Sequence, residues 1–323
     1  MVEQTLHNIL WLLVYPGFIF TLAIGVIASY VVRKVSALVQ WRVGPPVIKE
    51  GRILQSFYDI IKLLGKETLI PRDAQQIVFL AAPLVGFAGV LLLSTMLWRI
   101  SFTGQPYIGD IIVAMYLSIL PSLALILGSS ASASPHAAVG TGREMKLVMS
   151  YELPLALAFI VVIIKTGGTL NLAAIAASEP APIWSISGFL AFFLALLCIQ
   201  AKLGFVPFDI AEAETELGSG VLMEYSGALL AIWKMMQAMM LVALPLLLVM
   251  IFLGGFHVST PWLTLVGILK YVLILVLIIL IKNTNPRVRI DQAMKFFWVY
   301  CGIALAVAVV LAMCGNYYNI SWL

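Results

Sequence analysis

The chain of 323 residues contains 62% hydrophobic and only 11% charged residues, which excludes an ordinary soluble protein because its surface would need far more charge. Its formal net charge of +4 would suggest nucleic-acid affinity in a soluble protein, but in a chain this apolar the positions of the basic residues matter more than their sum. We therefore expect an integral membrane protein.

Long apolar segments follow one another along the chain. A transmembrane helix needs about 20 apolar residues, because it rises about 1.5 Å per residue across roughly 30 Å of hydrocarbon. Eight segments meet this requirement: 8–32, 76–97, 111–133, 147–165, 183–202, 221–253, 262–282 and 293–314. They are apolar on every face, which excludes the alternating pattern of a β-barrel. The sequence predicts an all-α polytopic protein, with residues 1–323 as a single membrane domain.

The first segment is expected to remain in the protein as a helix. Its apolar run is too long for a signal peptide, and no small-residue cleavage site follows it.

After the first segment comes a long basic loop, residues 33–75. Within this loop, Ile53, Phe57, Ile60 and Leu64 recur at helical spacing, with polar residues on the other face. This pattern predicts an amphipathic helix in the membrane interface, for binding either anionic lipid or a soluble partner.

The basic residues are distributed asymmetrically over the predicted loops. Most of the 19 Lys and Arg residues follow the odd-numbered segments. By the positive-inside rule, those loops face the cytoplasm and both termini face the outer side of the cell membrane. The asymmetry also supports an even number of spans.

The loop at residues 201–220, here called the acidic loop, contrasts most with the apolar chain. It carries Asp209, Glu212, Glu214 and Glu216, and Glu224 follows shortly after. Carboxylates gathered at a membrane edge indicate an ion path or a docking surface, because an ionisable group costs roughly 2.5 to 3.5 kcal/mol at the bilayer centre. The alternative is a solvated loop whose charges only mark the cytoplasmic face.

Further ionisable residues fall within the predicted spans. Glu152 and Glu224 lie near the cytoplasmic ends of their segments, whereas Lys234 and Lys270 lie deeper. Each needs a partner or a wet cavity, unless a lysine extends to the interface instead. We interpret them as a row of ionisable side chains that runs through the protein interior from the acidic loop toward the lysines. Neighbouring buried acids and lysines can exchange protons near neutral pH, so this row is a candidate proton path.

Cofactor ligands are scarce in this sequence. The three cysteines, Cys198, Cys301 and Cys314, form no Cys-x-x-Cys pair, and an iron–sulfur cluster normally needs four ligands. The three histidines are far apart and lack metal-ligand spacing. We expect no metal or cofactor in this chain, so any redox chemistry belongs to partner subunits.

Two sequence signatures carry a family resemblance. Pro207-Phe208-Asp209 through Glu212, Glu214, Glu216-Leu217, Ser219-Gly220 and Glu224-Tyr225 forms one, and Arg42, Gly44-Pro45, Gly51, Leu54-Gln55, Asp59, Lys62-Leu63 and Lys66-Glu67 the other. Ser150-Tyr151-Glu152 adds a shorter match. On these residues the chain resembles the H subunit of respiratory complex I, also called NADH dehydrogenase subunit 1, a family with eight spans.

The resemblance implies a subunit without redox centres that joins a cytoplasmic iron–sulfur arm to an ion-pumping membrane arm. It supports Glu152, Glu212, Glu214, Glu216 and Glu224 as residues of a proton route, with Asp209 beside them. The surface that binds the soluble arm is expected near Arg42, Asp59 and Lys62. The expected partners are an iron–sulfur small subunit, a hydrogenase-like large subunit and antiporter-like membrane subunits, in addition to the lipid bilayer. This chain would be a non-catalytic subunit of an oxidoreductase.

The chain departs from the quinone-reducing members of this family before the acidic signature. Those members usually have Glu-Thr-Asn-Arg, whereas this chain has Lys202-Leu203-Gly204-Phe205. The departure favours a ferredoxin-dependent membrane-bound hydrogenase or a related sulfur reductase. Iron–sulfur clusters, and a nickel–iron centre in the hydrogenase case, would then lie in the partner subunits.

Two alternatives remain at this point. One is the quinone-site subunit of a complex I-like NADH or ferredoxin dehydrogenase. The other is a self-contained secondary transporter, which would be expected to show inverted repeats and interrupted helices. The translocated ion, either protons or sodium, and the terminal acceptor stay open.

Overall fold

The computed structural model describes residues 14–44, 55–105, 111–213, 216, 218, 220–258, 260–318, 320 and 322. All regular elements in this part are helices. The longer ones are α2 (Phe18–Val39), α3 (Gln55–Leu64), α4 (Gln76–Thr103), α5 (Ile111–Ser130), α6 (Pro135–Lys165), α8 (Ile186–Lys202), α10 (Gly227–Phe252), α11 (Pro261–Thr284) and α13 (Gly302–Tyr317). The short ones are α7 (Leu172–Ala176), η2 (Pro182–Trp184), η3 (Gly220–Leu222), α12 (Ile290–Lys295) and the π-helix η4 (Phe296–Cys301).

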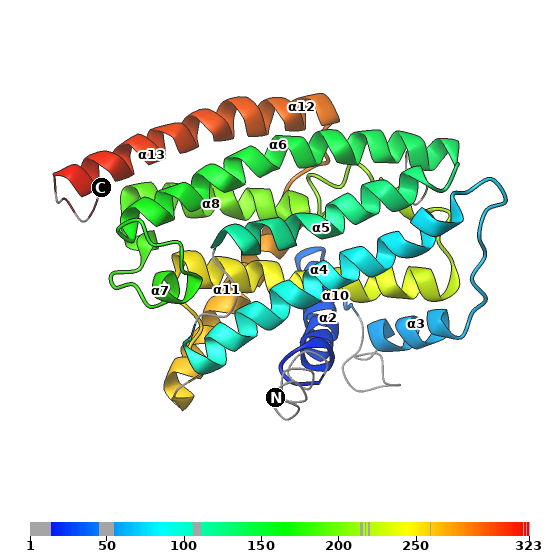
Figure 1. Ribbon diagram of the computed structural model, residues 1–323, viewed down its shortest axis with the longest axis horizontal. Helices are drawn as coiled ribbons and strands as arrows, with labels where there is room; N and C mark the ends of the chain where they lie inside the picture. Colours follow the sequence, from blue (N-terminus) through cyan, green and yellow to red (C-terminus); the bar gives the residue numbers. More distant parts are fainter. Residues whose placement is uncertain are drawn as a thin grey trace.

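Most of the long helices run along the longest axis of the molecule. Figure 1 shows α13, α6 and α8 in its upper part, with α4 and α10 below them and α2 and α11 at a different tilt. The helix α3 packs against the first part of α10, at the end of the molecule called here the α3 end. The short helix α7 lies at the opposite end (Figure 1).

The helix α10 forms the centre of the bundle. It packs against α2, α4, α8 and α11, and nearly all its side chains from Met239 to Phe252 are buried. A helix that is apolar on every face is stable in such a position, because no face has to meet polar surroundings. At Gly25 a side chain would collide with the backbone of Ala238, so this glycine lets α2 and α10 approach closely.

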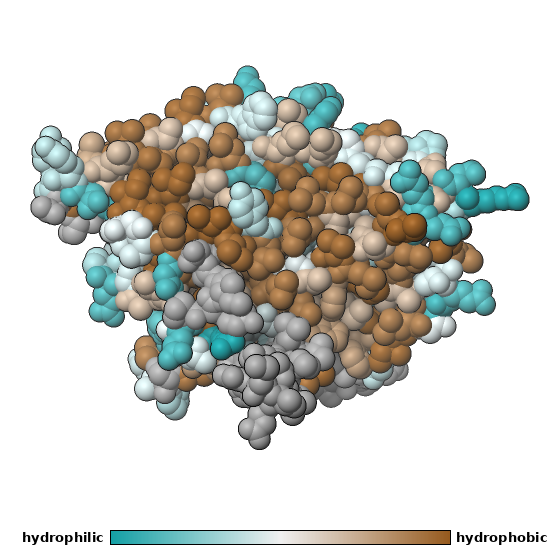
Figure 2. Space-filling view, viewed as in Figure 1, coloured by the Kyte–Doolittle hydropathy of each residue, from teal (hydrophilic) through white to brown (hydrophobic). Residues whose placement is uncertain are grey.

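The outer surface is apolar over a broad area. Figure 2 shows hydrophobic residues across the middle of one face, with the most hydrophilic residues toward the edges. Ile19, Leu84, Leu153, Leu269 and Ile303, from five different helices, are all exposed. An exposed apolar surface this extensive is expected of helices whose solvent is lipid. The chain is therefore a membrane protein.

The predicted spans correspond to the observed helices, with one shorter than expected. In the described part of the chain, seven helices are long and apolar enough to cross a membrane. The remaining predicted span, the fifth at 183–202, corresponds to α8, which has 17 residues. This is at the lower end of the range that crosses a bilayer. The predicted interfacial helix in the loop 33–75 is observed as α3.

Several predicted boundaries were wrong. Helix α6 begins at Pro135, not near 147. The apolar span was predicted to begin after Arg143 and Glu144, but the helix includes these polar residues because Arg143 contacts the acidic loop and Glu144 lines a cavity beside it. The sixth span begins at Gly227 rather than 221, after the separate turn η3. Helix α2, which corresponds to the first predicted span, runs from Phe18 to Val39, beyond the predicted end at 32. Residues 8–13 of that prediction lie outside the described residues.

Candidate functional site

A cavity of about 790 Å³ lies at the α3 end of the bundle. Its walls come from α2, α3, α5, α6, α10, the end of α11 and the acidic loop. The charged residues in its lining are Arg33, Asp59, Lys62, Lys66, Glu144, Lys202, Asp209, Glu212, Lys234, Lys282 and Arg287. So many charges within a membrane bundle require partners, and most of them have one nearby.

One wall of the cavity is the amphipathic helix α3. Its Ile60 is buried, and the hydroxyl groups of Ser56 and Ser29 lie 2.8 Å apart, which ties α3 to α2. Asp59 faces Arg33 of α2 at 4.0 Å. The apolar side chains Phe57 and Ile61 remain exposed. This pattern is typical of a helix at the membrane interface.

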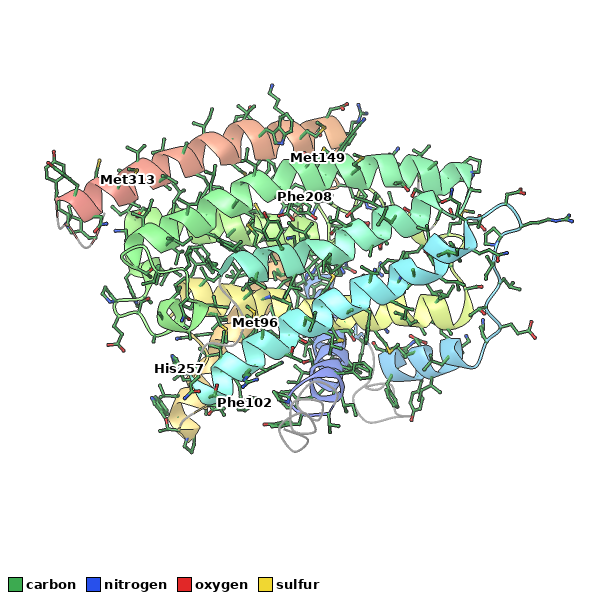
Figure 3. The ribbon with its side chains drawn as sticks, in the orientation of Figure 1. Met96, Phe102, Met149, Phe208, His257 and Met313 are labelled. Carbon is green, nitrogen blue, oxygen red and sulfur yellow. The ribbon has the colours of Figure 1, made fainter. Side chains whose placement is uncertain are left out.

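The start of the acidic loop is held by the segment that leads into the last helix. The backbone N–H of Val288 donates to the carbonyl oxygen of Pro207 at 3.1 Å, and Arg287 forms an ion pair with Asp209 at 3.0 Å. Phe208, labelled in Figure 3, is buried with its ring centroid 4.7 Å from that of Phe297 in η4. Two polar contacts and the aromatic contacts of Phe208 with Phe296 and Phe297 therefore fix Pro207-Phe208-Asp209 at the edge of the cavity.

Glu212 reaches across the cavity to α10. The side-chain amide of Gln237 donates to Glu212 Oε1 at 3.2 Å, and Lys234 Nζ donates to Gln237 Oε1, also at 3.2 Å. These three side chains form a continuous hydrogen-bonded chain along the cavity wall. An acid and an amine joined through one amide can respond electrostatically to each other's charge.

Glu216 occupies a different environment from Glu212. Its side chain is 61% exposed and forms an ion pair with Arg143 of α6 at 2.6 Å. The same guanidinium donates to the carbonyl oxygen of Ile210 at 3.5 Å, so Arg143 spans the acidic loop. Glu214, the other predicted acid of this loop, lies outside the described residues.

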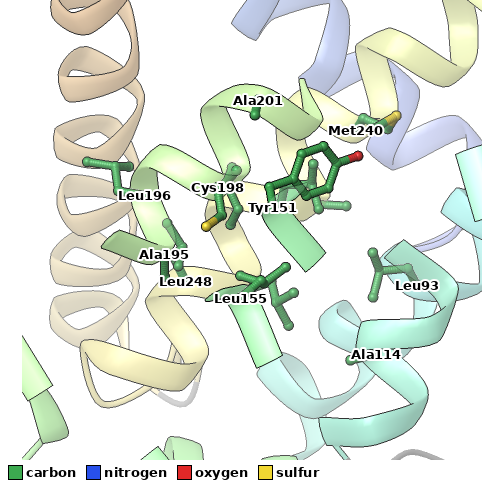
Figure 4. Close-up of a cluster of buried hydrophobic side chains, with 14 of the residues drawn as sticks. Leu93, Ala114, Tyr151, Leu155, Ala195, Leu196, Cys198, Ala201, Met240 and Leu248 are labelled. Carbon is green, nitrogen blue, oxygen red and sulfur yellow. The ribbon is translucent and has the colours of Figure 1, made fainter. Parts of the chain in front are cut away.

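Glu152 forms the most buried charged contact of the site. Its Oε1 lies 2.7 Å from Lys202 Nζ, and Lys202 also donates to Ser118 Oγ at 2.9 Å. The ring of Tyr151 is 5.6 Å from the lysine nitrogen, and its hydroxyl lies 3.2 Å from Ser122 Oγ. Figure 4 shows Tyr151 surrounded by apolar side chains of α6, α8 and α10. The helices α5, α6 and α8 thus each contribute polar side chains to one cluster, and apolar side chains surround this cluster.

Glu224 stands in the turn just before α10 and is half-buried. Its neighbour Tyr225 fixes this turn by stacking on Phe79 at 4.1 Å and donating to the carbonyl oxygen of Phe79 at 3.2 Å. Burial raises the pKa of the Tyr225 phenol, so the group stays protonated and keeps this hydrogen bond at neutral pH. The position of Glu224 is therefore set by a rigid anchor.

The structure brings only part of the predicted set together. Asp59, Lys62, Asp209, Glu212 and Lys234 line the cavity, and Glu152 joins it through Lys202. Four other described residues of the set do not line the cavity. Glu216 pairs with Arg143 near the surface, and Glu224 stands in the turn before α10. Lys270 donates to the carbonyl oxygen of Leu253 at 2.6 Å, at the far end of α10, and Arg42 is exposed just beyond the end of α2.

Six charged residues that line the cavity were not selected as site residues from the sequence: Arg33, Lys66, Glu144, Lys202, Lys282 and Arg287. Glu144 was missed because the predicted span began at 147, which left this acid outside any helix. Lys202 was noted only as a departure from a motif, although it is the partner of Glu152. The sequence did contain a signal for Glu144: it lies about two helical turns before Glu152, so a helix that included both would place them on the same face.

The described residues offer no evident metal site. Within them, no group of three or more His, Cys, Asp or Glu side chains is arranged to hold a metal ion. The three cysteines are unpaired, with Cys198 and Cys301 buried and Cys314 exposed.

Comparison with known proteins gives consistent relationships. The family described as NADH dehydrogenase matches residues 12–313. The H subunit of NADH-quinone oxidoreductase from Anoxybacillus flavithermus is 35% identical over 318 residues, covering 94% of this chain and 91% of that protein. Its counterpart from Bacillus cytotoxicus is 34% identical over 297 residues, covering 87% of this chain and 86% of that protein.

A solved structure is also similar. It belongs to the membrane-bound sulfane sulfur reductase, an archaeal respiratory membrane complex. Its matching chain superposes with a TM-score of 0.80 at 26% sequence identity, covering 91% of this chain and 96% of that chain.

Proposed function

Since the chain belongs to the NADH dehydrogenase family that includes the H subunit of NADH-quinone oxidoreductase, it is a membrane subunit of a complex I-like respiratory complex, and we propose a specific place for it. It anchors the catalytic arm of a ferredoxin-dependent energy-converting complex, either a membrane-bound hydrogenase or a sulfur reductase. It holds no redox centre, and it couples electron transfer in that arm to translocation of protons or sodium.

The observation that carries this proposal is Lys202. Quinone-reducing relatives usually have an acid at this point of the motif, whereas here a buried lysine forms an ion pair with Glu152. Phe205 likewise stands where those relatives have arginine, and its ring lies 4.5 Å from Lys282 Nζ. Since the polar groups of a ligand site decide its specificity, these changes favour a partner chemistry other than quinone. The similarity to a chain of a sulfane sulfur reductase supports the same branch.

The proposed coupling route uses the groups around the cavity. Asp209, Glu212 and Glu144 line the cavity, and Glu152 lies beyond Lys202. Neighbouring carboxylates cannot all ionise freely, so a change of charge in the attached arm would alter how many protons they hold. The three-residue chain from Glu212 to Lys234 and the Glu152–Lys202 pair are the two proposed branches of this route.

The proposed partners follow from the same reasoning. An iron–sulfur small subunit and a hydrogenase-like large subunit would seat at the α3 end, on the cytoplasmic side. Asp59 and Lys62 would face them there, with Arg42 nearby. Antiporter-like subunits would continue the complex within the membrane. Iron–sulfur clusters, and nickel in the hydrogenase case, would be in the soluble partners.

Composition and electron transfer of the intact complex test this proposal. We expect the complex purified through a tag on this chain to contain iron–sulfur clusters and to oxidise reduced ferredoxin. A hydrogenase would add nickel and hydrogen evolution, whereas a sulfur reductase would reduce polysulfide without nickel. NADH-dependent quinone reduction, blocked by a quinone-site inhibitor, would overturn the assignment.

That contrary outcome corresponds to the alternative function, the quinone-site subunit. The relatives at 34% and 35% identity favour it, because their names describe quinone oxidoreductases. The cavity volume of about 790 Å³ also falls in the range of small-molecule sites. Labelling of cavity residues by a photoreactive quinone would support the alternative.

A further inference from the structure

Lys202 is the last residue of α8 but does not extend to the surface. Its side chain is 0% exposed, although lysines at helix ends commonly extend toward a polar interface. A buried ammonium group is stable only with charged or hydrogen-bonded partners. The fold therefore holds this charge inside the bundle.

Two side chains provide those partners, one from each neighbouring helix. Glu152 of α6 supplies the opposite charge at 2.7 Å, and Ser118 of α5 accepts a hydrogen bond at 2.9 Å. The geometry leaves the lysine with a single carboxylate partner in the described part of the chain. Any change in the charge of Glu152 would act directly on Lys202.

Glu152 still has an unused acceptor. Its Oε2 is buried and has no hydrogen-bond partner among the described residues. A carboxylate with one oxygen against a cation and the other unpaired can take up a proton without first losing a hydrogen bond. Pro121 in α5 and Pro154 in α6 each lack a backbone N–H, so neither residue has a backbone donor to offer this pair.

Other titratable or charged groups lie near the pair or line the same cavity as Lys202. They are Glu144 and Tyr151 on α6, Cys198 on α8, Cys301 at the end of η4, Asp209 and Glu212 of the acidic loop, and Lys234 on α10. Of the residues that the structure describes, only Glu152 forms an ion pair with Lys202. Glu152 is therefore the acid whose charge acts most directly on Lys202.

We propose that Lys202, which lines the cavity, is a positioning residue for ion translocation, whose ammonium group holds the neighbouring Glu152 as a carboxylate. Uptake of a proton by Glu152 adds one positive charge to a pair that is otherwise neutral. That charge weakens the contact with Lys202 and is felt by the acids of the cavity. This role of Lys202 rests on the coupling stated under the proposed function.

Charge variants of Lys202 in the intact complex test this inference. We expect Lys202→Gln to lower the ions translocated per electron about tenfold, the size expected for one lost charge interaction. Lys202→Arg should restore most of the loss because it keeps the charge. The pH profile of translocation should change in Lys202→Gln and return to that of the unmodified complex in Lys202→Arg.

A structural role must be separated from a positioning role. Lys202→Gln leaves Glu152 buried without its cation and could prevent assembly, so the double variant Glu152→Gln/Lys202→Gln is made as well. It removes both charges and should assemble, as judged by co-purification of the soluble arm, but translocate poorly. Lys165→Gln, at the far end of α6, is the matched control and should behave as the unmodified complex.

Two kinds of result would contradict the proposed role of Lys202. Normal translocation per electron in Lys202→Gln or in the double variant would overturn the inference. An arginine variant as impaired as the glutamine variant, with the soluble arm still bound, would do so too. Neither result depends on the identity of the electron donor or acceptor, so the proposed function and this inference can fail separately.

Discussion

Glu212 and Glu216 lie four residues apart in the acidic loop but meet different surroundings. Glu212 lines the cavity and accepts a hydrogen bond from Gln237. Glu216 is largely exposed and pairs with Arg143 near the surface. A surface ion pair contributes about 1 kcal/mol or less to stability, because solvent screens it. Their surroundings, rather than their shared motif, should decide how much each contributes to coupling.

Neutralising these two acids should therefore have unequal effects. Glu212→Gln is expected to reduce ion translocation about tenfold or more, because it removes an ionisable group from the cavity wall. Glu216→Gln should reduce it by no more than about threefold, because its exposed partner can be solvated. Translocation per electron in vesicles measures both, with retention of the soluble arm as the control. Equal losses in the two variants would contradict the distinction.

At the scale of secondary structure, a close contact joins the segment after α3 to the start of α10, at the end of the molecule that holds the cavity. The segment after α3 packs on the start of α10, where the backbone N–H of Leu69 donates to Ser226 Oγ at 2.9 Å. Gly227 adopts a left-handed conformation with φ of +57°, and a Cβ there would lie 2.5 Å from the carbonyl oxygen of Glu67. Only glycine meets both demands without strain.

Gly227→Ala should therefore destabilise the α3 end. We expect a cost of about 1 to 3 kcal/mol, since the added methyl group meets backbone and the conformation is unfavourable for alanine. Thermal unfolding of the purified complex measures the loss. Gly142→Ala is the matched control, because a Cβ at Gly142 meets open space on the exposed side of α6. A Gly227→Ala variant as stable as this control would show that the backbone adjusts freely.

At the scale of the whole molecule, charge is concentrated toward the α3 end. The cavity and the charged residues that line it lie there, whereas α7 and the outer part of α11 lie at the other end. A bundle with this asymmetry orients in the membrane by its basic loops. The proposed seat for the soluble arm requires the α3 end to face the cytoplasm.

Labelling of single cysteines tests that orientation. Asp73 is exposed between α3 and α4, and Glu179 is exposed between α7 and η2. In a background with Cys314 replaced by serine, Asp73→Cys should react with a membrane-impermeant maleimide only from the cytoplasmic side. Glu179→Cys should react only from the outer side. The reverse pattern would place the acidic loop outside the cell and remove the basis for docking.

The sequence alone predicted the helical class, the approximate spans, the amphipathic helix and the position of the acidic loop. These are local properties, since apolar length and periodicity are read within a few tens of residues. It also selected Asp209, Glu212 and Lys234 for a proton path, and Asp59 and Lys62 for docking of the soluble arm. The structure places all five in the lining of one cavity. Their proton-path and docking roles stay predictions.

Only the tertiary structure decided which charges meet. Glu152 and Lys202 are 50 residues apart in the sequence, and their 2.7 Å contact depends on how α6 packs against α8. The same packing turns Glu144 toward the cavity, while the course of α11 takes Lys270 to the far end of α10. A local sequence pattern does not encode which side chains of different helices come into contact or how deeply they are buried, because helix packing is set by contacts along the whole bundle.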